Sequence, residues 1–205
     1  MTPRIVGRVS TFRLLRFVAA GVLVLASPAT AQSRAPGAQP RWPDRTFDAV
    51  RVWIQPTSSI PDWTATNIDA AHDAFVSWAQ LGLGVPFSFI ADSAAAEIRV
   101  RWVDRFDLPI SGHTRADNDS SLWIIGAALD LAVHHHSGGV LDADAMRAIA
   151  LHEVGHALGL EHSADSTTVM APAVRVRALT AADRADARRL YEIRDNVRPA
   201  HKEHR

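Results

Sequence analysis

Three histidines and one glutamate lie close together in the last third of the chain, at spacings that suit a metal site. His152 and His156 are four residues apart, so in a helix their imidazoles lie on one face and can bind a single zinc ion. Glu153 follows the first histidine and therefore lies beside the metal, where its carboxylate suits a general base for metal-bound water. The pattern predicts hydrolysis by zinc-activated water.

Gly159 and His162 complete the pattern HExxHxxGxxH, which runs from residue 152 to residue 162. A glycine can adopt the left-handed conformation that ends a helix and turns the chain back. That turn would return His162 to the metal as a third ligand. Three protein ligands leave the fourth position for water, as in catalytic zinc sites, whereas structural sites fill all four positions with protein ligands.

The apolar periodicity predicts the elements that position these side chains. A helix is expected over residues 141–158, with Asp142 as its N-cap. An earlier helix should begin between residues 62 and 66 and stop at Gly82, and a last helix should open with a capping-box variant at 180–183 and end at 193. Strands are expected at 47–54, 86–90, 97–103 and 122–131. Strands around one early helix, followed by two late helices, predict a single domain of the α/β (α+β) class.

The first 31 residues have the form of a secretory signal peptide. Several arginines precede an apolar run from Phe17 to Ala26, and residues 29–31 form a small-x-small cleavage site. The apolar run is too short to span a membrane, so we expect a mature chain without a membrane span, either secreted or periplasmic. Residues 32–45 contain several prolines and are expected to be a linker, and residues 194–205 a disordered tail.

The composition limits the possible partners and ligands. The 205 residues carry 22 basic and 22 acidic side chains, so no overall field favours nucleic acid. Cysteine is absent, so a metal site has to use histidine, aspartate and glutamate. We expect a monomeric protein.

The zinc-binding pattern and its neighbours resemble the metzincin metallopeptidases, and within them the matrixins. Ser163 directly follows the third histidine, residues 169–172 (VMAP) resemble the Met-turn, and Leu179-Thr180 with Asp183 resemble the closing helix of the family. The resemblance covers residues 46–193. It implies a catalytic domain with a twisted mixed sheet, an early helix, an active-site helix, a Met-turn and a C-terminal helix. It also implies one catalytic Zn²⁺, with Met170 as a hydrophobic floor beneath it.

The resemblance also implies a protein or peptide substrate and indicates where it binds. The peptide would lie extended across the metal and pair with an edge strand, for which residues 112–115, including His113 and Thr114, are the equivalent segment. The pocket that follows the scissile bond would accept an apolar side chain. Its wall would consist of Pro172, Ala173 and Val174. Arg175 or Arg177 could alter this preference, in a direction that the sequence does not give.

Other interpretations stay open at this stage. The domain could be a zinc-bound binding or adhesion module of the same fold without catalysis, although an intact Glu153 speaks against it. The matrixin region for a second zinc and for calcium is largely missing here. Calcium remains possible at Asp117, Asn118 and Asp119, but a polar turn is the better interpretation. The three histidines at 134–136 could bind a further metal, but we expect a solvated loop.

Overall fold

A computed structural model describes residues 39–192, which contain five strands and three helices. In chain order these are β1 (Val50–Ile54), α1 (Ala65–Ala79), β2 (Phe87–Phe89), β3 (Ile98–Val103), β4 (Gly112–Asn118), β5 (Ile124–Ala132), α2 (Ala143–Ala157) and α3 (Ala181–Glu192). The predicted helices and strands are all present, with ends shifted by a few residues. None of these helices is long and apolar enough to cross a membrane. The predicted signal peptide and C-terminal tail lie outside the described residues.

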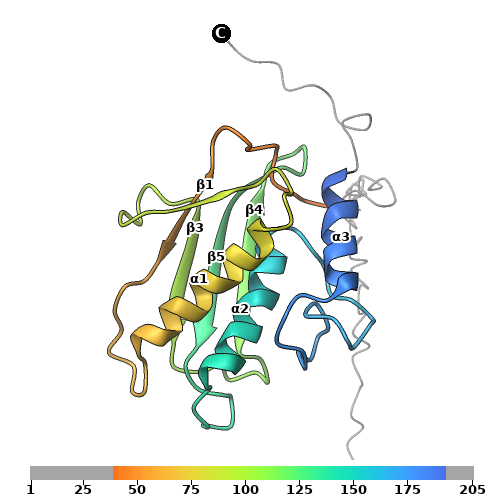
Figure 1. Ribbon diagram of the computed structural model, residues 1–205. Coiled ribbons are helices and arrows are strands. Elements are labelled where there is room, and N and C mark those ends of the chain that lie inside the picture. Colours follow the sequence, from red (N-terminus) through yellow and green to blue (C-terminus); the bar gives the residue numbers. More distant parts are fainter. Residues whose placement is uncertain (1–38, 193–205) are drawn as a thin grey trace, which may run out of the picture. The chain divides into compact units, whose positions relative to one another are not determined.

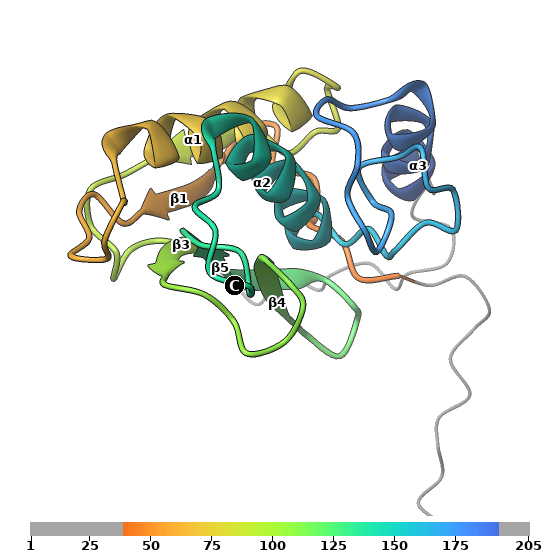
Figure 2. The same cartoon turned by 90° about the horizontal axis from the view of Figure 1, so that it is seen from below.

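The five strands form one mixed sheet in the order β2-β1-β3-β5-β4 (Figure 1). Four strands run parallel, and β4 pairs antiparallel with β5 at one edge of the sheet. Helices α1 and α2 lie on the same face of this sheet (Figure 2). In β3, for example, Ile98 and Val100 are buried toward the helices, whereas Arg99 and Arg101 are exposed. The mixed sheet with an early helix and two late helices is the fold class predicted from the sequence.

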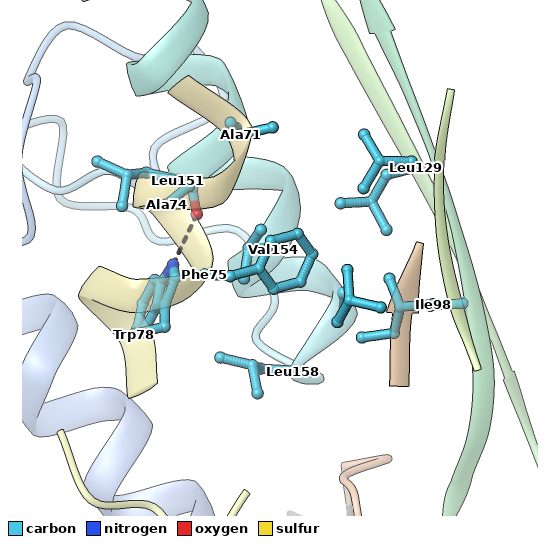
Figure 3. Close-up of a cluster of buried hydrophobic side chains, with 14 of the residues drawn as sticks. Ala71, Ala74, Phe75, Trp78, Ile98, Leu129, Leu151, Val154 and Leu158 are labelled. Atoms are coloured by element: carbon cyan, nitrogen blue, oxygen red, sulfur yellow. Dashed lines mark hydrogen bonds between the residues drawn. The ribbon is translucent and has the colours of Figure 1, made fainter. Parts of the chain in front are cut away.

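The core lies between the sheet and the helices α1 and α2 (Figure 3). Phe75 of α1 is fully buried and points toward Ile98 and Leu129 on the sheet. Trp78 is also fully buried, and its indole N–H donates to the carbonyl of Leu151 at 2.9 Å. This hydrogen bond ties α1 to α2. Because α2 carries most of the metal-binding pattern, the packing of α1 fixes where that pattern lies over the sheet.

Both ends of α2 follow the sequence prediction. The side chain of Asp142 accepts from the backbone N–H of Ala145 at 2.7 Å and so satisfies a free donor of the first turn. Beyond the last helical residue, Gly159 has a φ of 97°. A Cβ atom at Gly159 would also collide with the carbonyl of Pro40. The position therefore requires glycine both for its backbone conformation and for space.

The prediction that residues 32–45 form a linker is wrong for its C-terminal part. Arg41 and Trp42 are buried, and Arg41 forms a parallel bridge with Trp123. The indole N–H of Trp42 donates to the carbonyl of Ala157, at the end of α2, at 2.9 Å. Prolines suggested a linker, but burying a whole indole stabilises the docked segment by more than the local composition disfavours it. Residues 32–38 lie outside the described residues.

The prediction of a solvated loop at residues 134–136 is also wrong for its first histidine. His134 is buried, and its two ring nitrogens lie 3.1 Å from a carboxylate oxygen of Asp62 and 2.7 Å from one of Asp104. The hydrogen bonds to Asp62 and Asp104 raise the pKa of His134. The ring thus connects the segments that precede α1, follow β3 and follow β5. His135 is half-buried, and His136 is exposed.

The prediction of a polar turn at residues 117–119 holds for Asp119 only, because Asp117 and Asn118 are the last residues of β4 and Asp119 begins the turn that follows. One carboxylate oxygen of Asp119 accepts from the backbone N–H groups of Ser121 at 2.8 Å and Trp123 at 2.9 Å. Asp117 lies 3.9 Å from the guanidinium of Arg115. These carboxylates are therefore engaged in local contacts.

Candidate active site

The three histidines predicted to bind metal converge where α2 ends. The Nε2 atom of His152 lies 3.0 Å from Nε2 of His156 and 3.3 Å from Nε2 of His162. The first two rings come from successive turns of α2, and the turn at Gly159 returns the third. Between residues 39 and 192 this is the only group of three or more potential ligands close enough to hold a metal ion.

The donor set fits a zinc ion. Nitrogen ligands roughly 2.0–2.1 Å from a tetrahedral zinc lie about 3.3 Å from one another, close to both separations observed here. The other ring nitrogens are held by the main chain. Nδ1 of His152 donates to the carbonyl of Val169 at 2.6 Å, and Nδ1 of His156 donates to that of Leu160 at 2.8 Å. A neutral ring that donates from Nδ1 keeps the lone pair on Nε2 for the metal.

Burial favours the form of the histidines that binds metal. It lowers the pKa of His152 to about 4, and it holds the pKa of His156 below its usual range. The neighbouring imidazoles act in the same direction. Both rings are therefore neutral at pH 7 and need not lose a proton when a metal binds.

The segment around Met170 packs against α2 between the first two histidine positions. Met170 is buried, and a Cβ atom at Gly155 would overlap its sulfur. The buried carboxylate of Asp183 accepts from the N–H of Val169 at 3.1 Å and from the N–H of Thr180 at 2.8 Å. The capping box predicted at 180–183 is therefore present. The Asp183 carboxylate also holds Val169, whose carbonyl orients the ring of His152. The sequence did not indicate this role.

Glu153 points from α2 toward β4. The residue is only 4% exposed, and its Oε2 accepts from the hydroxyl of Thr114 at 2.7 Å. Burial raises the pKa of Glu153 to about 7, while the hydrogen bond from Thr114 acts in the opposite direction. A dication held by the nearby histidines would lower this pKa. A carboxylate beside a metal-bound water can accept a proton from that water.

A cleft with a volume of about 750 Å³ opens over the histidines and Glu153. One wall is β4 with His113 and Thr114, and the opposite wall is the segment that follows Met170. That second wall contains Pro172, Ala173 and Val174. Apolar residues at the start of α2 and just before it also line the cleft: Leu141, Ala145, Ala148 and Ile149. The structure thus brings the predicted substrate-binding residues to one cleft, and their contact with substrate stays a prediction.

The structure separates the two arginines that the sequence left unresolved. The guanidinium of Arg177 lies 3.7 Å from the carboxylate of Asp142 and 3.4 Å from that of Asp144. Both arginines line the cleft, but Arg175 also lines a smaller adjoining hollow and forms no ion pair with another residue of the described range. Arg175 is therefore the cation available to a bound peptide.

Sequence reasoning missed two contacts of the site. The side chain of Thr114 contacts Glu153, and Gly112 leaves the space that this carboxylate occupies. A signal was available: residues two apart in the predicted edge strand share a face, and 112 and 114 are a glycine and a hydroxyl residue. His135, which also lines the cleft, was assigned to a solvated loop.

The family model of the matrixins matches residues 42–192, from Trp42 to the end of α3. The chain belongs to the matrixins. Metalloendoproteinase 1-MMP of Arabidopsis thaliana is 27% identical in an alignment of 167 residues that covers 75% of this chain and 45% of the plant protein. Matrix metalloproteinase-16 of Homo sapiens is 43% identical over 63 residues, which are 31% of this chain and 8% of the human protein. This matrixin thus spans less than half the length of these relatives.

The plant relative is named a metalloendoproteinase and the human relative a matrix metalloproteinase. The metzincin-like fold expected from the sequence is confirmed by the family match together with the mixed sheet. The match begins at Trp42, which agrees with the burial of this residue in the domain.

Proposed function

We propose that this matrixin is a secreted zinc-dependent endopeptidase in which Glu153 is the general base. The observation that carries the proposal is the position of this carboxylate. It is buried next to the three-histidine cluster, it lines the same cleft, and it has a hydrogen-bond partner on the wall of that cleft. Zinc binding requires only the histidines, so it does not explain why an ionisable side chain, Glu153, is buried beside them.

The free edge of β4 supports binding of an extended peptide. In residues 39–192, β4 pairs with β5 and has no strand on its other side. The carbonyl of Ser111 accepts from the N–H of Ala132 and therefore points toward β5. Because backbone groups alternate along an antiparallel strand, those of Gly112 and Thr114 point to the free edge. A peptide that pairs there would lie along the cleft, beside the histidines and Glu153.

The residues of the chain then have distinct tasks. Zinc held by His152, His156 and His162 would polarise the scissile carbonyl and acidify a water molecule. Glu153 accepts a proton from the attacking water and returns it to the leaving amine. The edge of β4 holds the peptide backbone in line. The apolar wall of residues 172–174 receives the side chain that follows the scissile bond.

A cleavage assay tests the proposal. The wild-type chain from Gln32 onward is incubated with an unstructured protein such as casein, with and without a zinc chelator. The Glu153→Gln variant is incubated in the same way, and the zinc content of both proteins is measured. We expect cleavage by the wild type that the chelator abolishes, and a loss of roughly 10²-fold or more in Glu153→Gln without loss of zinc. Zinc in both proteins with no cleavage by either would favour a zinc-bound binding module. A wild type that binds no zinc would refute the assignment.

Secretion is proposed from the form of residues 1–31 and has its own test. The full-length chain is expressed in a bacterial host, and the protein is recovered from the periplasm and the medium. We expect the recovered protein to begin at Gln32 when its N-terminus is sequenced. Recovery from the cytoplasm alone, with residues 1–31 intact, would contradict the proposal.

A further inference from the structure

Gly112 of β4 provides the space for the Glu153 carboxylate. A Cβ atom at Gly112 would lie 2.5 Å from Oε1 of Glu153, 2.6 Å from Cγ and 2.7 Å from Cδ. Any side chain at this position would therefore displace the carboxylate. The φ of Gly112 is not in the left-handed region. What the structure requires at position 112 is thus the absence of a side chain and not an unusual backbone conformation.

Thr114 holds the same carboxylate from the next position on this face of β4. Its hydroxyl lies 2.7 Å from Oε2 of Glu153 and 3.0 Å from the main-chain carbonyl of Glu153. The hydroxyl has one hydrogen, so it donates to one of these oxygens at a time. When Glu153 carries a proton, the carboxyl can donate to the hydroxyl, which then donates to the carbonyl. One geometry therefore serves the carboxylate before and after it has accepted a proton.

Thr114 is the only hydrogen-bond partner of the Glu153 carboxylate among residues 39–192. A glutamate has several rotatable bonds, so ordering its side chain costs rotamer entropy. Its hydrogen bond to the Thr114 hydroxyl and its packing against Gly112 together offset this cost. Without the hydroxyl, the side chain would populate other rotamers at the edge of the cleft.

The same residue also faces the proposed path of the peptide. The side chain of Thr114 contacts Glu153, whereas the backbone groups of Thr114 point to the free edge of β4. We propose that Gly112 and Thr114 form a seat that positions Glu153 in register with the backbone of the bound peptide, with Thr114 as the positioning residue. The inference rests on the proposed function in that Glu153 acts as the base.

Two substitutions at position 114 test the seat. Thr114→Val keeps the shape of the side chain and removes the hydroxyl, and Thr114→Ser keeps the hydroxyl. We expect kcat of Thr114→Val to fall roughly tenfold to a hundredfold, the loss typical of one hydrogen bond to a charged group, with KM and zinc content little changed. Thr114→Ser should restore most of kcat. A Thr114→Val enzyme with wild-type kcat, or a loss that serine does not restore, would overturn the proposal.

Structures of the zinc-free proteins test the position of the Glu153 carboxylate independently of enzymatic activity. Crystal structures of zinc-free wild type, Thr114→Val and Thr114→Ser should show the Glu153 carboxylate against Gly112 in the wild type and serine proteins, and displaced in the valine protein. An unmoved carboxylate in Thr114→Val would overturn the proposal even if kcat fell. If the wild type cleaves nothing, the proposed function fails, whereas these structures still decide the seat.

Gly112→Ala is a second route to the same test, should Thr114→Val fold poorly. It leaves the hydroxyl of Thr114 in place and fills the space of the carboxylate. We expect a displaced carboxylate and a lower kcat, whereas a carboxylate that stays in place with wild-type kcat would refute the seat.

Discussion

Replacing Glu153 by Gln should stabilise the metal-free protein increasingly as the pH rises from about 5 to about 7, and should have little effect below about pH 4. Glu153 is 4% exposed, and burial raises its pKa from 4.5 to about 7. Below the lower value the carboxyl is protonated in both the folded and the unfolded chain. Between the two values the unfolded chain releases the proton while the folded chain keeps it. The folded state therefore loses stability as the pH rises through this window.

The size of the effect follows from the width of the window. The two pKa values differ by about 2.5, and one pKa unit corresponds to about 1.4 kcal/mol, so the loss reaches about 3 kcal/mol near pH 8. Glutamine has the same shape, can accept the hydrogen bond of Thr114 and carries no charge, so it avoids this loss. The buried ring of His152, with a pKa of about 4, gives the opposite pH dependence. Because that ring is present in both proteins, its contribution cancels in the difference.

Urea unfolding of both proteins in the presence of a chelator measures this difference. The gain in the free energy of unfolding of Glu153→Gln should grow from near zero at about pH 4 to about 3 kcal/mol at about pH 8, mainly between about pH 5 and 7. A difference that does not change with pH would refute the conclusion that the folded chain buries this carboxyl in its neutral form. With zinc bound, the window should move to lower pH, because the dication favours the carboxylate.

Three further substitutions test other parts of the structure. Trp42→Ala should lower the free energy of unfolding by about 3–5 kcal/mol in urea, whereas an unchanged value would contradict the burial of this segment. Gly155→Ala should push the side chain of Met170 aside and weaken zinc binding in a chelator competition, and equal affinity would show that this contact does not support the site. We compare kcat/KM for peptides with lysine after the scissile bond with kcat/KM for peptides with glutamate there. Arg175→Glu should raise the ratio of lysine to glutamate peptides roughly fivefold. The ion-paired Arg177, changed to Gln, is the matched control, and an equal shift there would contradict the assignment.

The helical part of the site could be predicted because its geometry is local. The spacing of His152 and His156 fixes their common face in any α-helix, and Gly159 ends that helix by a conformation that its own residue type permits. The cap at Asp142 depends on an amide three residues away. In each case the sequence within one or two turns contains all the interacting groups.

The contacts that the sequence did not reveal join segments that are far apart in the chain. Trp42 donates to a carbonyl 115 residues away, and His134 contacts Asp62 at a separation of 72 residues. The hydroxyl of Thr114 lies 39 residues before the carboxylate that it binds. Composition and local pattern describe a proline-rich segment as a linker and a histidine tract as a loop. The long-range partners that bury these side chains are set only when the sheet and helices pack together.

The rotation of α2 about its axis decides whether its local pattern becomes a site. Successive residues of a helix point about 100° apart, so residues 152–156 face several elements at once. His152 and His156 share one direction, Glu153 faces β4, Val154 is buried in the core, and Gly155 lies against the Met-turn segment. A rotation by one residue would turn a histidine toward β4 and the glutamate into the core, where a charge is costly. Two hydrogen bonds oppose such a rotation. The indole of Trp78 in α1 donates to the carbonyl of Leu151, and the indole of Trp42 donates to the carbonyl of Ala157, so both ends of the stretch 152–156 are held. The fold therefore contributes a fixed rotation of the helix, and the motif contributes the spacing along it.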